Sequence, residues 1–234
     1  MTSRSYRELL ACVTETPFSY IEPPFNFNAP EVTRYPPEVT GFNLLESMRR
    51  RLGWASLEGK ALLDFGCGVR FARTIHNLGL PLASYVGVDV NADAIAWLQS
   101  NLTDGRFTFA HLDARNALYN PDGETDPDAL ARLNLPPCDA ACMFSVITHQ
   151  GPEEARLTFT QLRRVASPGG QLYFTAFIDE AVQHYTERIP NSPGSKSTYE
   201  PETLIRLVES AGWGIEAIYP KIFLQQQAMV CAAV

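Results

Sequence analysis

The stretch Ala61-Leu62-Leu63-Asp64-Phe65-Gly66-Cys67-Gly68-Val69-Arg70 decides the fold of this chain. Its apolar start ends in an acid, two glycines follow one residue apart, and an apolar, amphipathic segment comes directly after it. This order predicts a buried strand, a tight glycine turn and the start of a helix. In an open α/β sheet, such a turn lies at the carboxyl end of a strand, where ligands bind. Glycine is required because a backbone that approaches a ligand closely adopts dihedral angles that a Cβ would block.

The bulk properties indicate one large, acidic domain. The 234 residues carry a formal net charge of -7, which argues against nucleic acid or an anionic membrane as the main partner. The N-terminus lacks the apolar core of a signal peptide, and no stretch is long enough to span a bilayer. The five cysteines are odd in number and lack paired metal-ligand spacings. We therefore predict no metal site and a reducing, cytoplasmic setting, whereas the oligomeric state cannot be predicted from these properties.

Residues 1–41 differ in composition from the rest and are predicted to form an N-terminal arm on a domain that spans residues 42–234. The segment from Pro17 to Pro37 is dense in proline and aromatic residues, which excludes a helix or a central strand there. A purely disordered tail would hold few aromatic residues, so we expect the arm to pack across the domain. Two interpretations stay open: simple surface packing, or a lid over a substrate cleft.

Downstream of the arm, segments typical of strands and helices alternate. Apolar runs predict strands at 61–65, 85–89, 107–112, 139–146, 171–177, 214–219 and 223–231. Helical spacing of apolar residues predicts helices at 43–52, 69–78, 92–102, 152–166 and 201–211, and a short one around 128–133 within a polar insertion. This alternation predicts a Rossmann-like, doubly wound α/β fold: a mostly parallel seven-stranded sheet with helices on both faces. The last two strands, joined at Pro220-Lys221, are expected to form an antiparallel edge pair.

The glycine turn also narrows the ligand class. A dinucleotide site needs a third glycine for close helix packing, and Phe71 occupies that position. Asp64, two residues before the first glycine, would lie unfavourably beside a pyrophosphate but suits a ligand with an ammonium or sulfonium charge. The turn therefore disfavours an NAD-dependent oxidoreductase, which we keep as an alternative.

Five marks in order resemble the class I S-adenosylmethionine-dependent methyltransferases, from about residue 42 to the C-terminus. They are DFGCG at 64–68, VDVN at 88–91, LDA at 112–114, CDAACMFSVITH at 138–149 and LRRVASPGGQL at 162–172. Each mark is weak alone, whereas the ordered set is specific. The resemblance implies S-adenosylmethionine as cofactor and methyl transfer as the reaction. One departure is Arg70, which stands where family members usually carry a third glycine.

At the methionine end of the cofactor, the resemblance implies roles for five residues. Asp64 would hold the ammonium group, directly or through water. Gly66, Cys67 and Gly68 would lend backbone groups to the methionine and the ribose. Ser145 would line the floor of the site through its backbone.

At the nucleoside end, the resemblance implies four more residues. Asp89 would accept hydrogen bonds from the two ribose hydroxyls, and Val90 would pack on the adenine. Asp113 would bond the adenine amino group, with the backbone of Ala114 beside it. The alternatives are that Asp89 and Asn91 only cap the next helix and that Asp113 is a turn residue.

His149 is the candidate catalytic residue, because it follows the fourth strand and histidine titrates in the range that a general base needs. The alternative is a histidine that only shapes the loop. The resemblance also places the acceptor site near His184, Tyr185 and Tyr199. We therefore predict a methyltransferase for a small-molecule acceptor, with O-methylation favoured over N- or C-methylation. A non-catalytic module that binds S-adenosylmethionine is the second alternative.

Overall fold

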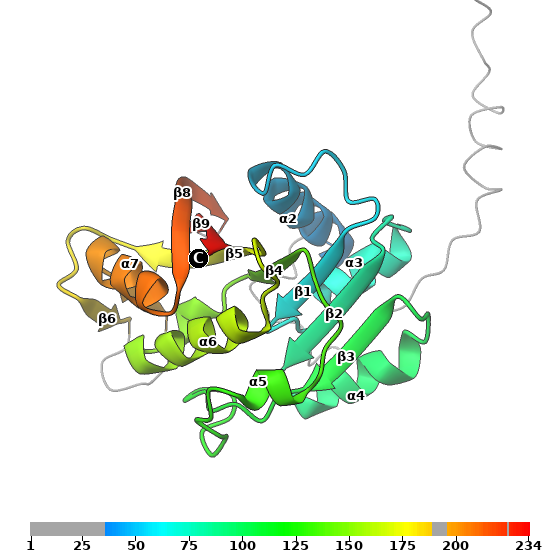
Figure 1. Ribbon diagram of the computed structural model, residues 1–234, viewed down its shortest axis with the longest axis horizontal. Helices are drawn as coiled ribbons and strands as arrows, with labels where there is room; N and C mark the ends of the chain where they lie inside the picture. Colours follow the sequence, from blue (N-terminus) through cyan, green and yellow to red (C-terminus); the bar gives the residue numbers. More distant parts are fainter. Residues whose placement is uncertain (1–35, 189–195, 224) are drawn as a thin grey trace, which may run out of the picture.

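The computed structural model describes residues 36–188, 196–223 and 225–234 (Figure 1). Residues 1–35, most of the predicted arm, lie outside the described residues. Residues 37–41 of the arm belong to helix α2, Pro37–Arg51, which begins earlier than the predicted start at residue 43. Proline at the first position of a helix forfeits no hydrogen bond and presets φ for the helix, so Pro37 starts α2 instead of ending the arm.

One mixed sheet forms the centre of the molecule. Its strands are β1 Ala61–Phe65, β2 Ser84–Asp89, β3 Phe107–His111, β4 Ala140–Met143, β5 Gln171–Ile178, β6 Tyr185–Glu187, β7 Ser197–Tyr199, β8 Trp213–Phe223 and β9 Gln226–Ala233. The first five strands are parallel in the order β3-β2-β1-β4-β5, and β9 pairs antiparallel with both β5 and β8. The Rossmann-like, mostly parallel fold with an antiparallel edge pair is therefore confirmed.

Within the described ranges the sheet has nine strands instead of the predicted seven, and the difference lies at its edges. The two strands that the prediction missed, β6 and β7, have only three residues each, which is too short for a periodic pattern. The predicted connection at Pro220-Lys221 is wrong, because β8 runs through it to Phe223. Among the described strands, β8 pairs only with β9, so it is an edge strand, where the missing N–H of a proline is tolerated.

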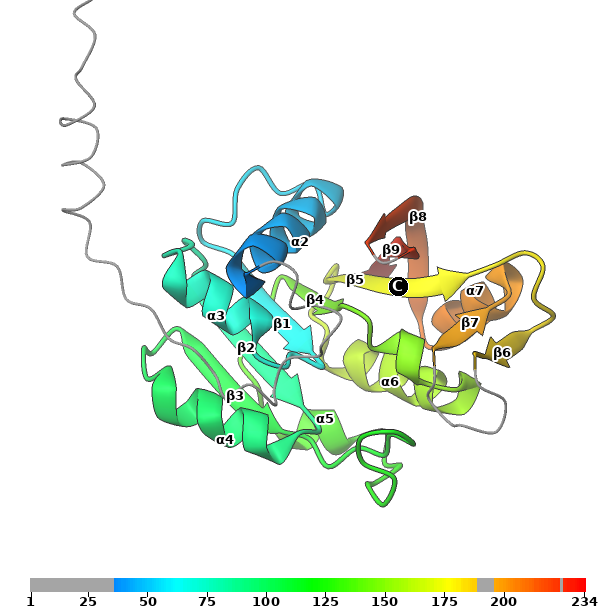
Figure 2. The same ribbon diagram turned by 180° about the vertical axis from the view of Figure 1, so that it is seen from behind.

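Helices cover both faces of this sheet (Figures 1 and 2). They are α2, α3 Arg70–Asn77, α4 Ala92–Asn101, α5 Ala129–Arg132, α6 Pro152–Val165 and α7 Pro201–Ser210. Neighbouring strand residues point to opposite faces: Leu62 joins a core with apolar side chains of α2, α3 and α4, and Leu63 joins a core with those of α5, α6 and α7. None of the helices in the described ranges combines the length and apolarity that crossing a bilayer requires.

Helix α2 packs closely against α3, the helix that follows the glycine turn. A Cβ at Gly41 would lie 2.0 Å from the hydroxyl oxygen of Thr74. The buried Arg73 Nη2 lies 2.8 Å from Glu38 Oε1, and Asn77 Nδ2 donates to the same oxygen at 3.0 Å. The position of α3, and with it the end of the glycine turn, therefore depends on a buried ion pair with α2.

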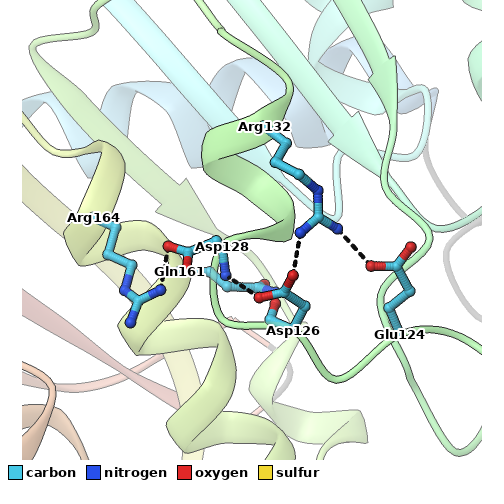
Figure 3. Close-up of polar contacts among 6 residues, drawn as sticks. All are labelled: Glu124, Asp126, Asp128, Arg132, Gln161 and Arg164. Atoms are coloured by element: carbon cyan, nitrogen blue, oxygen red, sulfur yellow. Dashed lines mark hydrogen bonds and ion pairs between the residues drawn. The ribbon is translucent and has the colours of Figure 1, made fainter.

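Exposed ion pairs fix the polar insertion between β3 and β4 against α6 (Figure 3). Arg132 pairs with Asp126 and Glu124, and Arg164 of α6 pairs with Asp128. Such solvent-exposed pairs contribute little each. Two of the three pairs lie within the insertion, and the third joins it to α6.

Candidate functional site

The glycine turn after β1 is folded back onto the end of β2. The N–H groups of Gly66 and Cys67 both donate to Val88 O, at 2.8 and 3.1 Å. Gly66 has a φ of +74°, and a Cβ on it would lie 2.5 Å from Val146 Cγ2. A side chain is therefore excluded here twice, by the left-handed backbone and by the close approach of the chain after β4.

Because a side chain is excluded at Gly66 for two reasons, we predict a large loss of stability when one is introduced there. Gly66→Ala is expected to destabilise the fold by more than Gly59→Ala, because Gly59 has the same φ of +74° but open space around its Cβ position. Left-handed strain costs on the order of 1–3 kcal/mol in both variants, and the overlap with Val146 adds about 1–3 kcal/mol in the first. Urea unfolding of the two variants measures the difference, and equal losses would show that Val146 moves aside without cost.

The next glycine joins the turn to the acid at the end of β2. Gly68 has a φ of +47° with nothing within 4 Å of a Cβ position, and its N–H donates to Asp89 Oδ2 at 2.7 Å. Asp89 Oδ1 accepts from the N–H of Asn91 at 2.9 Å. Burial raises the pKa of the Asp89 carboxyl, and the N–H groups of Gly68, Asn91 and Val90 oppose this rise. The turn and the β2 acid thus form one unit.

Arg70 does not disturb this turn. It is the first residue of α3, and the left-handed positions of the turn are occupied by Gly66 and Gly68. Since a helical backbone accepts any ordinary residue, the departure from the family pattern at this position needs no unusual conformation.

Asp64 lies deeper than a ligand-binding carboxylate at the surface would. It is 2% exposed. Its Oδ2 accepts from the Tyr85 hydroxyl at 2.6 Å, and its Oδ1 accepts from Cys142 Sγ at 3.5 Å. Burial raises the pKa of Asp64 to about 7, against the opposing effect of these two hydrogen bonds. The carboxylate therefore contacts core donors from β2 and β4, which the sequence did not indicate.

The predicted adenine residues lie at the ends of β2 and β3. Val90 is half-buried, and its carbonyl lies 3.2 Å from His111 Nε2. Asp113 is exposed, and its carboxylate accepts from Asn120 Nδ2 at 2.8 Å. Ala114 is buried, and its carbonyl accepts from the same amide at 3.1 Å. The hydrogen bond from Asn120 to Asp113 is consistent with the alternative that Asp113 is a turn residue. The sequence did not indicate Asn120 as its partner.

Ser145 is held by residues from two other strands. Its φ of +61° is uncommon for a residue with a side chain. Its N–H donates to Thr175 Oγ1 at 2.9 Å, and its hydroxyl accepts from Gln226 Nε2 at 2.8 Å. Thr175 in turn donates to Gln226 Oε1 at 2.6 Å. Because the chain turns away at this residue, β4 is shorter than the strand predicted at 139–146.

His149 ends the single 3₁₀ turn Ile147–His149 that follows β4. Its ring is half-buried and meets the ring of Tyr119 edge-on, at 5.7 Å between centroids. Its carbonyl accepts from Asn116 Nδ2 at 3.4 Å. The histidine therefore lies at the carboxyl edge of the sheet, on the same side as the glycine turn.

The three residues predicted near the acceptor site lie around β6 and β7. Tyr199 is buried and donates to the carbonyl of Gln150 at 2.7 Å, which gives it a structural contact to the loop that carries the candidate base. Tyr185 is half-buried and donates to Glu187 Oε1 at 2.9 Å. His184 is exposed, with Nδ1 at 3.2 Å from a Glu200 oxygen. Within the part of the chain that the structure describes, no cluster of three or more potential ligands suits a metal ion.

A family model described as a methyltransferase domain matches residues 40–218. No curated protein matches the chain significantly.

Solved structures share the fold, among them two that are named as methyltransferases. CalS10, an amino pentose methyltransferase from Micromonospora echinaspora, superposes with a TM-score of 0.55 at 12% identity, over 86% of this chain and 93% of that one. Magnesium protoporphyrin IX methyltransferase from Synechocystis PCC 6803 gives 0.51 at 17% identity, over 84% and 79%. The pyocyanin biosynthetic protein PhzM gives 0.53 at 17% identity over 82% of this chain, which spans only 55% of that protein.

Proposed function

The chain belongs to the methyltransferase-domain family, and we propose that it transfers the methyl group of S-adenosylmethionine to a small-molecule acceptor, with oxygen favoured over nitrogen or carbon. Family membership selects the methyltransferase prediction over the alternative of an NAD-dependent oxidoreductase. The observation that carries the proposal is the unit formed by Gly68 and Asp89, in which a β2 carboxylate binds the turn after β1.

The residues of this unit fit the cofactor. A carboxylate offers about four acceptor sites, so the hydrogen bonds from the backbone of Gly68, Asn91 and Val90 do not exhaust Asp89 as an acceptor for ribose hydroxyls. The open space over Gly68 admits a ligand close to the backbone. Val90, Asp113 and Ala114 follow β2 and β3 at the same edge of the sheet, and we assign them to the adenine.

The methionine end is assigned to Asp64, Gly66, Cys67 and Ser145. The buried charge of Asp64 attracts a cationic ligand, and the glycine turn lets backbone groups approach it. Bound S-adenosylmethionine supplies a sulfonium methyl group as the electrophile. The chain then contributes alignment of the acceptor and exclusion of water, which are the main means of catalysis for an in-line displacement.

His149 is assigned the role of general base toward an acceptor hydroxyl. His149→Ala is expected to lower kcat by roughly a hundredfold or more, since general base catalysis contributes about 10²–10⁴. His76→Ala is the control, because His76 lies in the last turn of α3, away from the carboxyl edge. A His149→Ala enzyme that keeps its full rate would reject the role.

Calorimetric titration with S-adenosylmethionine tests the proposal as a whole, with NADH as the competing ligand. We expect binding of S-adenosylmethionine and none of NADH. Turnover across a panel of hydroxyl, amine and carbon acceptors then separates an enzyme from a non-catalytic module, which would bind the cofactor without transferring its methyl group.

The setting of the reaction is also part of the proposal. The net charge of -7 disfavours nucleic acid and anionic membranes as partners. The four cysteines in the described part of the chain are free thiols, which supports a reducing, cytoplasmic location.

A further inference from the structure

We propose that Tyr85 is a positioning residue for cofactor binding: its hydroxyl, with the thiol of Cys142, holds the buried Asp64 carboxylate aligned and ionised beneath the glycine turn. The inference rests on the proposed function, because it concerns the cationic end of S-adenosylmethionine. Tyr85 lies on β2, outside each of the five sequence marks that resemble the methyltransferase family.

The geometry supports this role. The Tyr85 hydroxyl lies 2.6 Å from Asp64 Oδ2, a separation typical of a hydroxyl that donates to a charged carboxylate. Cys142 Sγ lies 3.5 Å from the other oxygen, so each oxygen receives one donor from a neighbouring strand. The Tyr85 side chain is 1% exposed, and its ring packs edge-on against Phe107 and Phe109, at 5.9 and 6.1 Å between centroids. The hydroxyl is therefore held in place and has no access to water.

The hydrogen bond from Tyr85 affects the ionisation of Asp64, because burial and neighbouring charges already shift the pKa of this carboxyl. Burial raises the pKa of Asp64 to about 7, the hydrogen bonds from Tyr85 and Cys142 lower it, Asp89 raises it and Arg70 lowers it. Three neighbouring groups stay protonated because burial raises the pKa of each: the thiols of Cys67 and Cys142 and the hydroxyl of Tyr85. Loss of the Tyr85 hydroxyl therefore raises the pKa of Asp64 further and leaves more of it neutral at pH 7.

Cofactor binding thus becomes dependent on pH. A cation binds more tightly to ionised Asp64, so affinity rises as the pH increases through the pKa of this group. Tyr85→Phe keeps the packed ring and removes only the donor. We expect it to weaken S-adenosylmethionine binding at pH 7 by roughly tenfold and to move the midpoint of the pH dependence upward by about one unit.

The test is calorimetric titration of S-adenosylmethionine between pH 6 and pH 9 with the wild type, Tyr85→Phe and Tyr173→Phe. Tyr173 is a matched control, because it is also fully buried but its hydroxyl lies 3.4 Å from Arg51 instead of near Asp64. An upward midpoint shift in Tyr85→Phe alone supports the proposal. Unchanged affinity, or a uniform loss with the wild-type midpoint, would overturn it and leave Tyr85 a packing role.

A second measurement separates this inference from the proposed function. The carboxyl carbon of Asp64 is titrated by NMR in the free wild type, Tyr85→Phe and Cys142→Ala, which needs no cofactor. An upward shift of the Asp64 midpoint in both variants shows that the two donors hold the charge, and no shift in either overturns the inference. If the Asp64 midpoint shifts but the wild type binds no S-adenosylmethionine at any pH, the proposed function fails, and with it the role of Tyr85 in cofactor binding.

Discussion

Asp89→Ala is expected to weaken S-adenosylmethionine binding by about a hundredfold or more. Two ribose hydroxyls would each lose a hydrogen bond to a charged acceptor, and each such bond contributes roughly 1.5–3 kcal/mol. The variant also removes the acceptor of the Gly68 N–H, so the turn loses its tie to β2. Calorimetric titration at a fixed pH measures the loss of affinity.

Asp104→Ala is the matched control for this experiment. Asp104 lies in the turn before β3, at the opposite edge of the sheet, and pairs with Arg106 at 2.9 Å. It should bind the cofactor like the wild type. Thermal unfolding of both variants checks that Asp89→Ala is folded at the assay temperature. Equal affinity of a folded Asp89→Ala and the wild type would refute the assignment of the ribose to this residue.

Glu38→Ala is expected to lower the free energy of unfolding by about 3–5 kcal/mol, because it removes the carboxylate that pairs with the buried charge of Arg73. The Arg73 side chain is 1% exposed and that of Glu38 is 10% exposed. Asn77 loses its hydrogen bond to Glu38 Oε1 at the same time. Urea unfolding, followed by far-ultraviolet circular dichroism, measures the loss.

Two further variants isolate the cause of this loss. Glu153→Ala removes a similar pair, Glu153–Arg156, whose glutamate side chain is 86% exposed, and it should leave the urea midpoint unchanged. The double variant Glu38→Leu/Arg73→Met removes both buried charges and should recover most of the stability, since apolar residues replace buried ion pairs well. A Glu38→Ala protein as stable as Glu153→Ala would show that the pair contributes little.

Much of the fold was predictable because its signals are local. The strand at 61–65 and the cap at Asn91, whose side chain accepts from Ala94 N at 3.0 Å, depend on residues next to one another in the chain. The start of α2 was not predicted, since its proline-rich approach is typical of an extended arm. Strands β6 and β7 were missed because tertiary pairing stabilises them, β7 with the end of β5 and β6 with β7, and a three-residue segment carries no pattern of its own.

The candidate site, like the fold, has residues that the sequence predicted and contacts that it did not. The glycines and the acids at the strand ends were visible in the sequence, because a parallel sheet brings the carboxyl ends of its strands to one edge. The partners of these residues were not visible. Asp64 meets Tyr85 and Cys142, and Ser145 meets Gln226, across 21, 78 and 81 positions of the chain.

The sequence by itself determined the alternation of strands and helices, the turn at Gly66 and Gly68 and the acid at Asp89, since periodicity and backbone freedom are properties of neighbouring residues. Only the tertiary structure decided which buried polar groups face one another. The parallel strands that lie side by side in this sheet are separated in the chain by a crossover helix or a longer segment, and no local pattern specifies their side-chain pairs. Burial makes such contacts matter for ionisation: it raises the pKa of Asp64, so that the charge of this carboxyl depends on its hydrogen bond from Tyr85.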